Sequence, residues 1–135
     1  MHYLHAVIKE TLRLHPPAKS SKTRCEANGI SRRERDPTLW EEPEEFKPER
    51  FLNSSLDFNG ENFEYIPFGA GRRSCPGDKF ALGVAKLTMA NLMHKFDTSL
   101  PDGLKPEDID PVDYVGITVQ EKKPLLFVAT PVTSY

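Results

Sequence analysis

The sequence lacks any uninterrupted stretch of about 20 apolar residues, which is the length that an α-helix needs to cross a lipid bilayer. Its N-terminal residues show no signal-peptide pattern either. We therefore expect the chain to have no membrane anchor of its own and to be soluble.

A strong charge of one sign is also absent. The formal net charge is only −2, which argues against nucleic acid as a general partner. Two cysteines, Cys25 and Cys75, allow at most one disulfide, and thiols kept reduced are the favoured interpretation. Leu, Ile, Val and Phe make up about a quarter of the 135 residues, enough for one small domain with a thin hydrophobic core. We find no internal repeat.

The sequence does contain a glycine-rich loop around one thiol, at residues 68–77 (FGAGRRSCPG). Glycine has no Cβ, so such a loop lets the backbone lie flat against a ligand. Cys75 stands just before a predicted helix, whose N-terminus carries roughly half a positive charge and favours a thiolate. A thiolate on this loop is a suitable soft ligand for a metal cofactor. Arg72 and Arg73 beside it suit a carboxylate of that cofactor.

Apolar periodicity predicts two helices. In residues 2–14 apolar side chains recur at spacings near three and four, and Pro16 and Pro17 end the pattern. Residues 79–96 are apolar on nearly all faces, so we expect this helix to be buried on several sides. Gly83 in its middle is explained by a close approach of another helix.

The loop resembles the haem-binding loop of the cytochrome P-450 family, the haem-thiolate monooxygenases, in the types and spacing of Phe68, Gly71, Arg73, Cys75 and Gly77. The resemblance implies that Cys75 is the axial thiolate ligand of the iron of haem b (iron protoporphyrin IX). It also implies that Arg73 meets a haem propionate and that Phe68 packs near the sulfur. Gly71, Gly77 and Ala81 are the other residues expected at the cofactor.

Two further segments carry the same resemblance. Residues 10–17 (ETLRLHPP) are similar to the Glu-x-x-Arg helix of the family, and residues 43–51 (PEEFKPERF) to the segment that supplies its second arginine. Glu10, Arg13 and Arg50 would then form a buried structural triad that fixes the loop and performs no chemistry. Without the resemblance, Glu10 and Arg13 would be an exposed ion pair worth about a few tenths of a kcal/mol, and Arg50 a surface residue.

The implied fold is the C-terminal part of the cytochrome P-450 fold, mainly α with small β elements. It comprises the Glu-x-x-Arg helix, a meander, the cysteine-ligand loop, a long buried helix and a terminal β-hairpin. We assign the β-rich runs 115–119 and 125–129 to that hairpin. In the family the hairpin reaches toward the substrate pocket, so Val115, Ile117 or Thr118 are candidate substrate contacts, although an ordinary pair of strands explains them equally well.

We interpret residues 1–135 as one partial domain in which residues 18–36 are atypical. The family has apolar, strand-like runs here, whereas this segment is mostly basic, so at least one strand is missing and an internal deletion is expected. The charge run suits a phosphate or a partner, but a solvated loop is the favoured interpretation.

The pattern is most like the plant microsomal branch of the family. It implies insertion of one oxygen atom of O2 into a small hydrophobic organic substrate, with electrons from NADPH through NADPH-cytochrome P-450 reductase. The oxidative chemistry belongs to the cofactor, while the protein supplies the ligand, the orientation and a dry pocket. The family's location is the cytosolic face of the endoplasmic reticulum membrane. The long central helix and most of the pocket have no counterpart here, so we expect a fragment or truncated product with little or no activity alone.

Other classes of protein fit the sequence less well. A dinucleotide-binding loop is disfavoured because Ser74 stands where its third glycine belongs. A phosphate-binding P-loop is disfavoured because no Gly-Lys-Ser/Thr occurs. A truncated, non-catalytic haem-binding or interaction module stays open as an alternative, because parts of the enzyme are missing.

Overall fold

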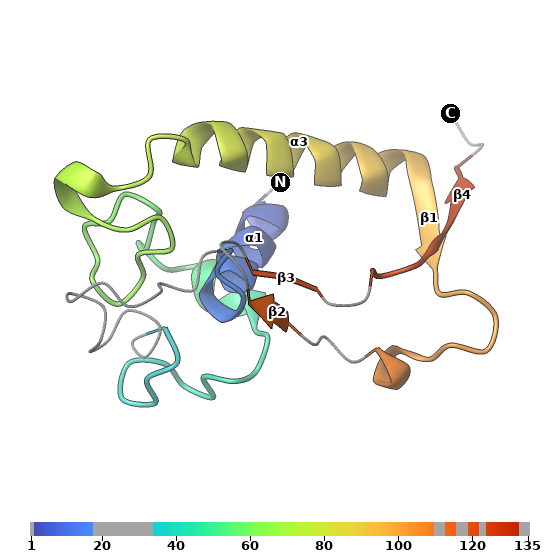
Figure 1. Cartoon of the computed structure of the whole chain (residues 1–135), viewed down its shortest axis with the longest axis horizontal. Helices are drawn as coiled ribbons and strands as arrows, with labels where there is room; N and C mark the ends of the chain where they lie inside the picture. The colour runs from blue at the N-terminus through green and yellow to red at the C-terminus, as the bar shows by residue number, and fades with distance from the viewer. Residues whose placement is uncertain (1, 18–33, 110–112, 116–118, 122–123, 133–135) are drawn as a thin grey trace.

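The computed structural model describes residues 2–17, 34–109, 113–115, 119–121 and 124–132. Its two long helices are α1 (His2–Leu14) and α3 (Asp78–Lys95). The described part of the chain between them is irregular and contains the 3-10 helices η1 (Pro48–Phe51) and η2 (Gly71–Arg73). Figure 1 shows α3 running across the top of the view above α1, with the irregular segment on the left and β1 and β4 on the right.

Helix α1 has the bounds that its apolar periodicity predicted, so this prediction is confirmed. The helix ends before Pro16 and Pro17, because proline lacks the N–H that an interior helical residue donates. The last helical hydrogen bond runs from the backbone N–H of His15 to the carbonyl oxygen of Thr11, at 2.7 Å.

The hydrophobic core lies between α1, the irregular segment and α3, and consists of Ala6, Ile8, Trp40, Phe51, Phe58, Tyr65 and Leu82. Tyr65 is fully buried at its centre, and its ring lies 5.1 Å from that of Phe51 and 5.9 Å from that of Phe58, measured between centroids. The Tyr65 hydroxyl donates a hydrogen bond to the carbonyl oxygen of Lys9 in α1, at 2.9 Å. Burial raises the pKa of this hydroxyl, so it is neutral and free to donate.

The buried Lys9 ties the irregular segment to α1 a second time. Its ammonium donates a hydrogen bond to the carbonyl oxygen of Leu56 and lies over the rings of Phe51 and Phe58, at 5.9 and 5.6 Å from their centroids. A lysine is rarely buried unless its charge is paired. Here the charge is paired with the carboxylate of Asp57, whose Oδ1 lies 3.8 Å from the ammonium, and the carbonyl oxygen and the two ring faces complete its surroundings.

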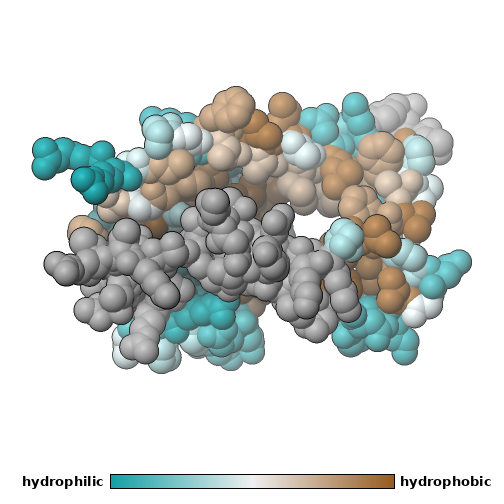
Figure 2. All heavy atoms as spheres, in the orientation of Figure 1, coloured by the Kyte–Doolittle hydropathy of each residue, from teal (hydrophilic) through white to brown (hydrophobic). Residues whose placement is uncertain are grey.

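The predicted second helix is confirmed within one residue, but its predicted burial is wrong. Leu82 is the single buried residue of α3, and Phe80 and Leu87 are 79% and 67% exposed. Figure 2 shows apolar atoms along the outer side of this helix. Within the described structure α3 packs on α1 and continues into β1, so only one of its apolar faces is covered. The expected close approach at Gly83 is also absent, since an added Cβ there would meet no atom within 4 Å.

Two separate antiparallel strand pairs replace the predicted hairpin. β1 (Phe96–Ser99) pairs with β4 (Val128–Pro131), and β2 (Asp113–Val115) pairs with β3 (Val119–Glu121). The pairing of residues 115–119 with 125–129 was therefore a wrong prediction. The run 115–119 contains Gly116, which weakens a strand interior, and its two ends belong to different strands that face each other.

A third 3-10 helix, η3 (Pro106–Asp108), lies between β1 and β2 in the chain. Of the candidate substrate contacts, Val115 is the last residue of β2, and Ile117 and Thr118 lie outside the described residues, as does most of segment 18–36. No helix in the described ranges is long and apolar enough to cross a membrane.

Candidate haem-ligating site

The structure brings Glu10 and Arg13 together as a fully buried pair on one face of α1. The guanidinium donates Nε to Glu10 Oε2 at 2.8 Å and Nη2 to Glu10 Oε1 at 2.9 Å, a bidentate pair. Its other three N–H groups go to the carbonyl oxygens of Glu34, Pro43 and Glu45, at 2.7, 2.7 and 3.2 Å. All five donors of Arg13 are therefore used, and they hold three points of the irregular segment against α1.

Arg50 of η1 completes the predicted triad from the other side. Its Nε donates to Glu10 Oε1 at 3.1 Å, and its Nη1 donates to the carbonyl oxygen of Glu41 at 3.0 Å. Glu10 Oε1 also accepts the backbone N–H of Lys47, at 2.8 Å. The Arg50 side chain is 12% exposed, so this arm of the network lies nearer the solvent than Arg13 does.

The Glu10 carboxylate is held ionised by these partners. Burial alone raises its pKa, but the hydrogen bonds from Arg13 and from the backbone of Lys47, with the charges of Arg13 and Arg50, outweigh burial and bring the pKa below 4.5. Nothing in the sequence indicated that Trp40 covers the network, yet both guanidinium groups lie over its ring, at 5.2 Å for Arg13 and 5.8 Å for Arg50. The Trp40 ring therefore covers the two guanidinium groups of this buried network.

The glycine-rich loop folds back on itself and presents its thiol to solvent. The backbone N–H of Cys75 donates to the carbonyl oxygen of Phe68 at 2.9 Å, which closes the loop. Gly69 and Gly71 have φ of +76° and +73°, a conformation that residues with a Cβ rarely adopt. Cys75 is free and exposed, and a Cβ added to Gly77 would lie 3.9 Å from its sulfur, an ordinary contact.

A neighbouring turn explains why the loop also depends on Gly60. This residue has φ of +70°, and a Cβ added to it would lie 2.8 Å from the carbonyl oxygen of Gly69. The turn at residues 58–60 therefore packs directly against the loop backbone, at a distance that only glycine allows.

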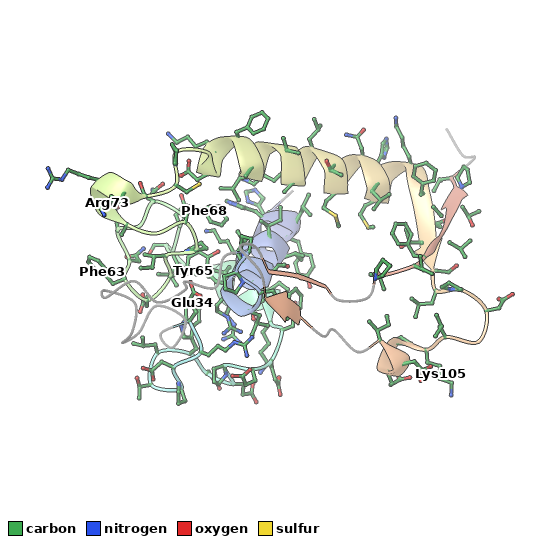
Figure 3. All side chains as sticks on the ribbon, viewed as in Figure 1. Glu34, Phe63, Tyr65, Phe68, Arg73 and Lys105 are labelled. Atoms are coloured by element: carbon green, nitrogen blue, oxygen red, sulfur yellow. The ribbon has the colours of Figure 1, made fainter. Side chains whose placement is uncertain are left out.

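An apolar groove of about 400 Å³ lies between α1 and α3, beside this loop. Leu4, Ile8 and Leu12 of α1 line it from one side, and Ala81 of α3 and Phe68 of the loop line it as well. Figure 3 shows Phe68 between the loop and α3, close to α1, and Arg73 at the outer edge of the loop. The structure thus brings together Phe68, Ala81 and, through the backbone bond, Cys75, while Arg73 is exposed on η2.

The donor set fits haem better than a bare metal ion. Within the described residues no group of three or more His, Cys, Asp or Glu side chains could hold a metal. Haem carries its iron in the macrocycle and needs one axial ligand from the protein, for which a thiolate serves. Cys75 has a free, exposed thiol, and its backbone is bonded to Phe68, which lines the apolar groove, so the residues present fit such a ligand and a surface for the ring.

Comparison with known proteins identifies the family of the chain. The family model described as "Cytochrome P450" matches residues 27–128. The tabersonine/lochnericine 19-hydroxylase of Catharanthus roseus is 50% identical over 155 aligned positions, which cover all of this chain and 30% of that protein. The norfluorocurarine oxidase of a Strychnos species is 48% identical over 143 positions, which cover 93% of this chain and 28% of that protein. Among solved structures, retinoic-acid-bound cyanobacterial CYP120A1 matches with a TM-score of 0.72 and 28% identity, over 96% of this chain and 32% of that chain.

The chain therefore belongs to the cytochrome P450 family, and its fold is the C-terminal part of the P450 fold. It spans about 30% of the length of the curated relatives that it matches. The alignment with the 19-hydroxylase has more positions than this chain has residues, so that relative carries residues inside the aligned region that this chain lacks. The family generally binds haem and acts as a monooxygenase on small organic molecules, and several of the relatives are named as hydroxylases or oxidases.

Proposed function

We propose that this chain supplies the haem-ligating part of a haem-thiolate monooxygenase, with Cys75 as the axial ligand of the iron. The observation that carries the proposal is the free, exposed Cys75, whose backbone is bonded to Phe68 at the border of the apolar groove. Phe68 and Ala81 would pack against the porphyrin, because both already line the groove. Arg73 would reach a propionate from its exposed place on η2.

When bound, haem would supply the activation of O2 and the insertion of one oxygen atom into a C–H bond. The residues of the chain have other tasks. The turns at Gly69 and Gly71, whose left-handed backbone glycine adopts without strain, would keep the thiol pointed away from the loop backbone. The Glu10–Arg13–Arg50 network would hold the irregular segment against α1, whose side chains line the groove.

The proposed redox partner and substrate class follow from the same family resemblance. NADPH-cytochrome P-450 reductase would deliver electrons from NADPH, and the substrate would be a small hydrophobic organic molecule. The resemblance to the plant microsomal branch supports the cytosolic face of the endoplasmic reticulum membrane as the location. Residues 1–135 would be one part of the complete catalytic domain.

A second function is favoured by one observation, which is the uncovered outer face of α3. Phe80, Val84 and Leu87 are all exposed and recur at spacings of four and three, as on a helix that packs against another helix. The chain would then act as a non-catalytic haem-binding or interaction module.

Haem loading separates these functions. Purified chain is titrated with haem, reduced under carbon monoxide and examined by absorption spectroscopy, beside C75A and, as a matched control, C25A. We expect a thiolate-type Soret band in wild type and C25A and its loss in C75A. A folded protein that shows no such band would overturn the ligand proposal and leave the interaction module. Turnover with added reductase then distinguishes a haem binder from an enzyme.

A further inference from the structure

Glu34 is a buried carboxyl group that the haem site does not use. The residue is 3% exposed, and its backbone carbonyl accepts Arg13 Nη1 at 2.7 Å. Its side chain has an unsatisfied acceptor, because Oε1 is buried and accepts no hydrogen bond from the described residues. Figure 3 shows Glu34 close to Tyr65, in the region where the irregular segment meets α1. Such an oxygen carries the full cost of losing its water if it is ionised.

Two cations among the described residues, Arg13 and Arg35, act on Glu34, and both are engaged elsewhere. All five N–H donors of Arg13 go to Glu10 or to backbone carbonyls, as described above. Arg35 donates to Glu44 Oε2 at 2.8 Å and to the carbonyl oxygen of Leu14 at 2.7 Å. In the described structure neither guanidinium donates a hydrogen bond to the Glu34 carboxylate, and each acts on it only through its charge.

The balance of these effects favours the neutral acid. Burial raises the pKa of Glu34 to about 7 from an ordinary value of 4.5, against the opposing charges of Arg13 and Arg35. Tyr65, which faces the same region from the segment before the loop, is neutral, and the negative charge of Glu10 is taken up by its own two arginines. Nothing in the described surroundings therefore donates a hydrogen bond to an ionised Glu34 Oε1.

We propose that Glu34 is a proton-dependent lock on the attachment of residues 34–51 to α1: the neutral carboxyl is accommodated in the core, and its ionisation weakens the attachment. The sign follows from linkage. The folded pKa lies above the unfolded one, so folding takes up a proton, and stability falls as the pH rises from about 4.5 toward about 7. At higher pH the loss is complete.

Trp40 is the single tryptophan of the chain and lies on the Arg13–Arg50 network, so its emission reports this attachment. We would titrate the full chain between pH 5 and pH 8.5 and follow Trp40 emission and urea unfolding. The test variant is E34Q, which keeps the shape and removes the charge. The matched control is E44Q, which changes an exposed carboxylate beside Arg35.

We expect wild type and E44Q to show an emission change centred near neutral pH, and E34Q to lose it. The unfolding equilibrium constant should rise roughly ten- to a hundredfold between pH 5 and pH 8 in wild type, and by less than about threefold in E34Q. E34Q retains all four histidines of the chain, so the difference between the variants belongs to Glu34.

A direct measurement does not depend on unfolding. In protein labelled with carbon-13 at glutamate carboxyls, the resonance that disappears in E34Q identifies Glu34, and its chemical shift is followed against pH. A midpoint within about one unit of neutrality supports the lock. A midpoint near the ordinary glutamate value, or equal pH dependence of wild type and E34Q, would overturn it.

Discussion

Replacing Glu10 with glutamine tests whether the buried charge network holds the fold. Glu10 accepts four hydrogen bonds, two from Arg13 and one each from the backbone of Lys47 and from Arg50. Glutamine keeps the size but has one acceptor oxygen, so its amide N–H groups would face the N–H groups of Arg13. The change also leaves a fully buried guanidinium without a counter-charge. Breaking a buried pair in this way costs about 3–5 kcal/mol.

The matched control is E44Q, since Glu44 is also bonded to an arginine at 2.8 Å but is 68% exposed. An exposed pair contributes about 0–1 kcal/mol, so the control should unfold at nearly the wild-type urea concentration. The assay is urea unfolding followed by Trp40 emission. Equal unfolding midpoints for E10Q and E44Q would refute the reasoning, because burial is the chief difference between the two sites.

Three further predictions use the same assay. Arg13→Ala should cost about 3–5 kcal/mol and Arg50→Ala about half as much, because Arg50 is partly exposed and its bonds are longer; the reverse order would contradict this. Gly60→Ala should destabilise by about 2 kcal/mol or more, whereas Gly83→Ala, in open helical surroundings, should stabilise by about 0.5–1 kcal/mol; equal effects would count against the packing described. Acid should destabilise wild type below about pH 4.5, because the lowered pKa of Glu10 means that its contribution is lost as the carboxylate is protonated; a flat profile there would show that Glu10 is not held ionised.

The parts of the fold that could be predicted are those with local signals. Helix α1 follows from apolar spacing and two prolines, and α3 from a long apolar run that contains no proline. The turn at Gly60 follows from an Asn-Gly pair. The strand β1 had no such signal, because it has four residues, three of them polar, and its partner β4 lies about 30 residues further along the chain.

The candidate site likewise contains residues that local spacing predicts and residues whose roles depend on distant parts of the chain. Spacing alone put Glu10 and Arg13 on one face, but the inclusion of Arg50 needed the family resemblance, since no local rule joins α1 to η1. Trp40, Lys9 and Glu34 escaped prediction because their roles depend on which distant backbone atoms surround them. A buried lysine, and a buried glutamate whose Oε1 has no hydrogen-bond partner among the described residues, contradict ordinary burial preferences, so those preferences argued against both.

The most direct test of the central claim is whether the sulfur of Cys75 binds the haem iron. In the C25S variant Cys75 is the single cysteine, so labelling cysteine with sulfur-34 marks that atom alone. Resonance Raman spectra of the haem-loaded ferric protein would then be compared with and without the label. A band in the iron–sulfur stretching region that moves to lower frequency with the heavier isotope is the predicted result. A haem spectrum in which no band responds to the label would contradict the assignment of Cys75 as the axial ligand.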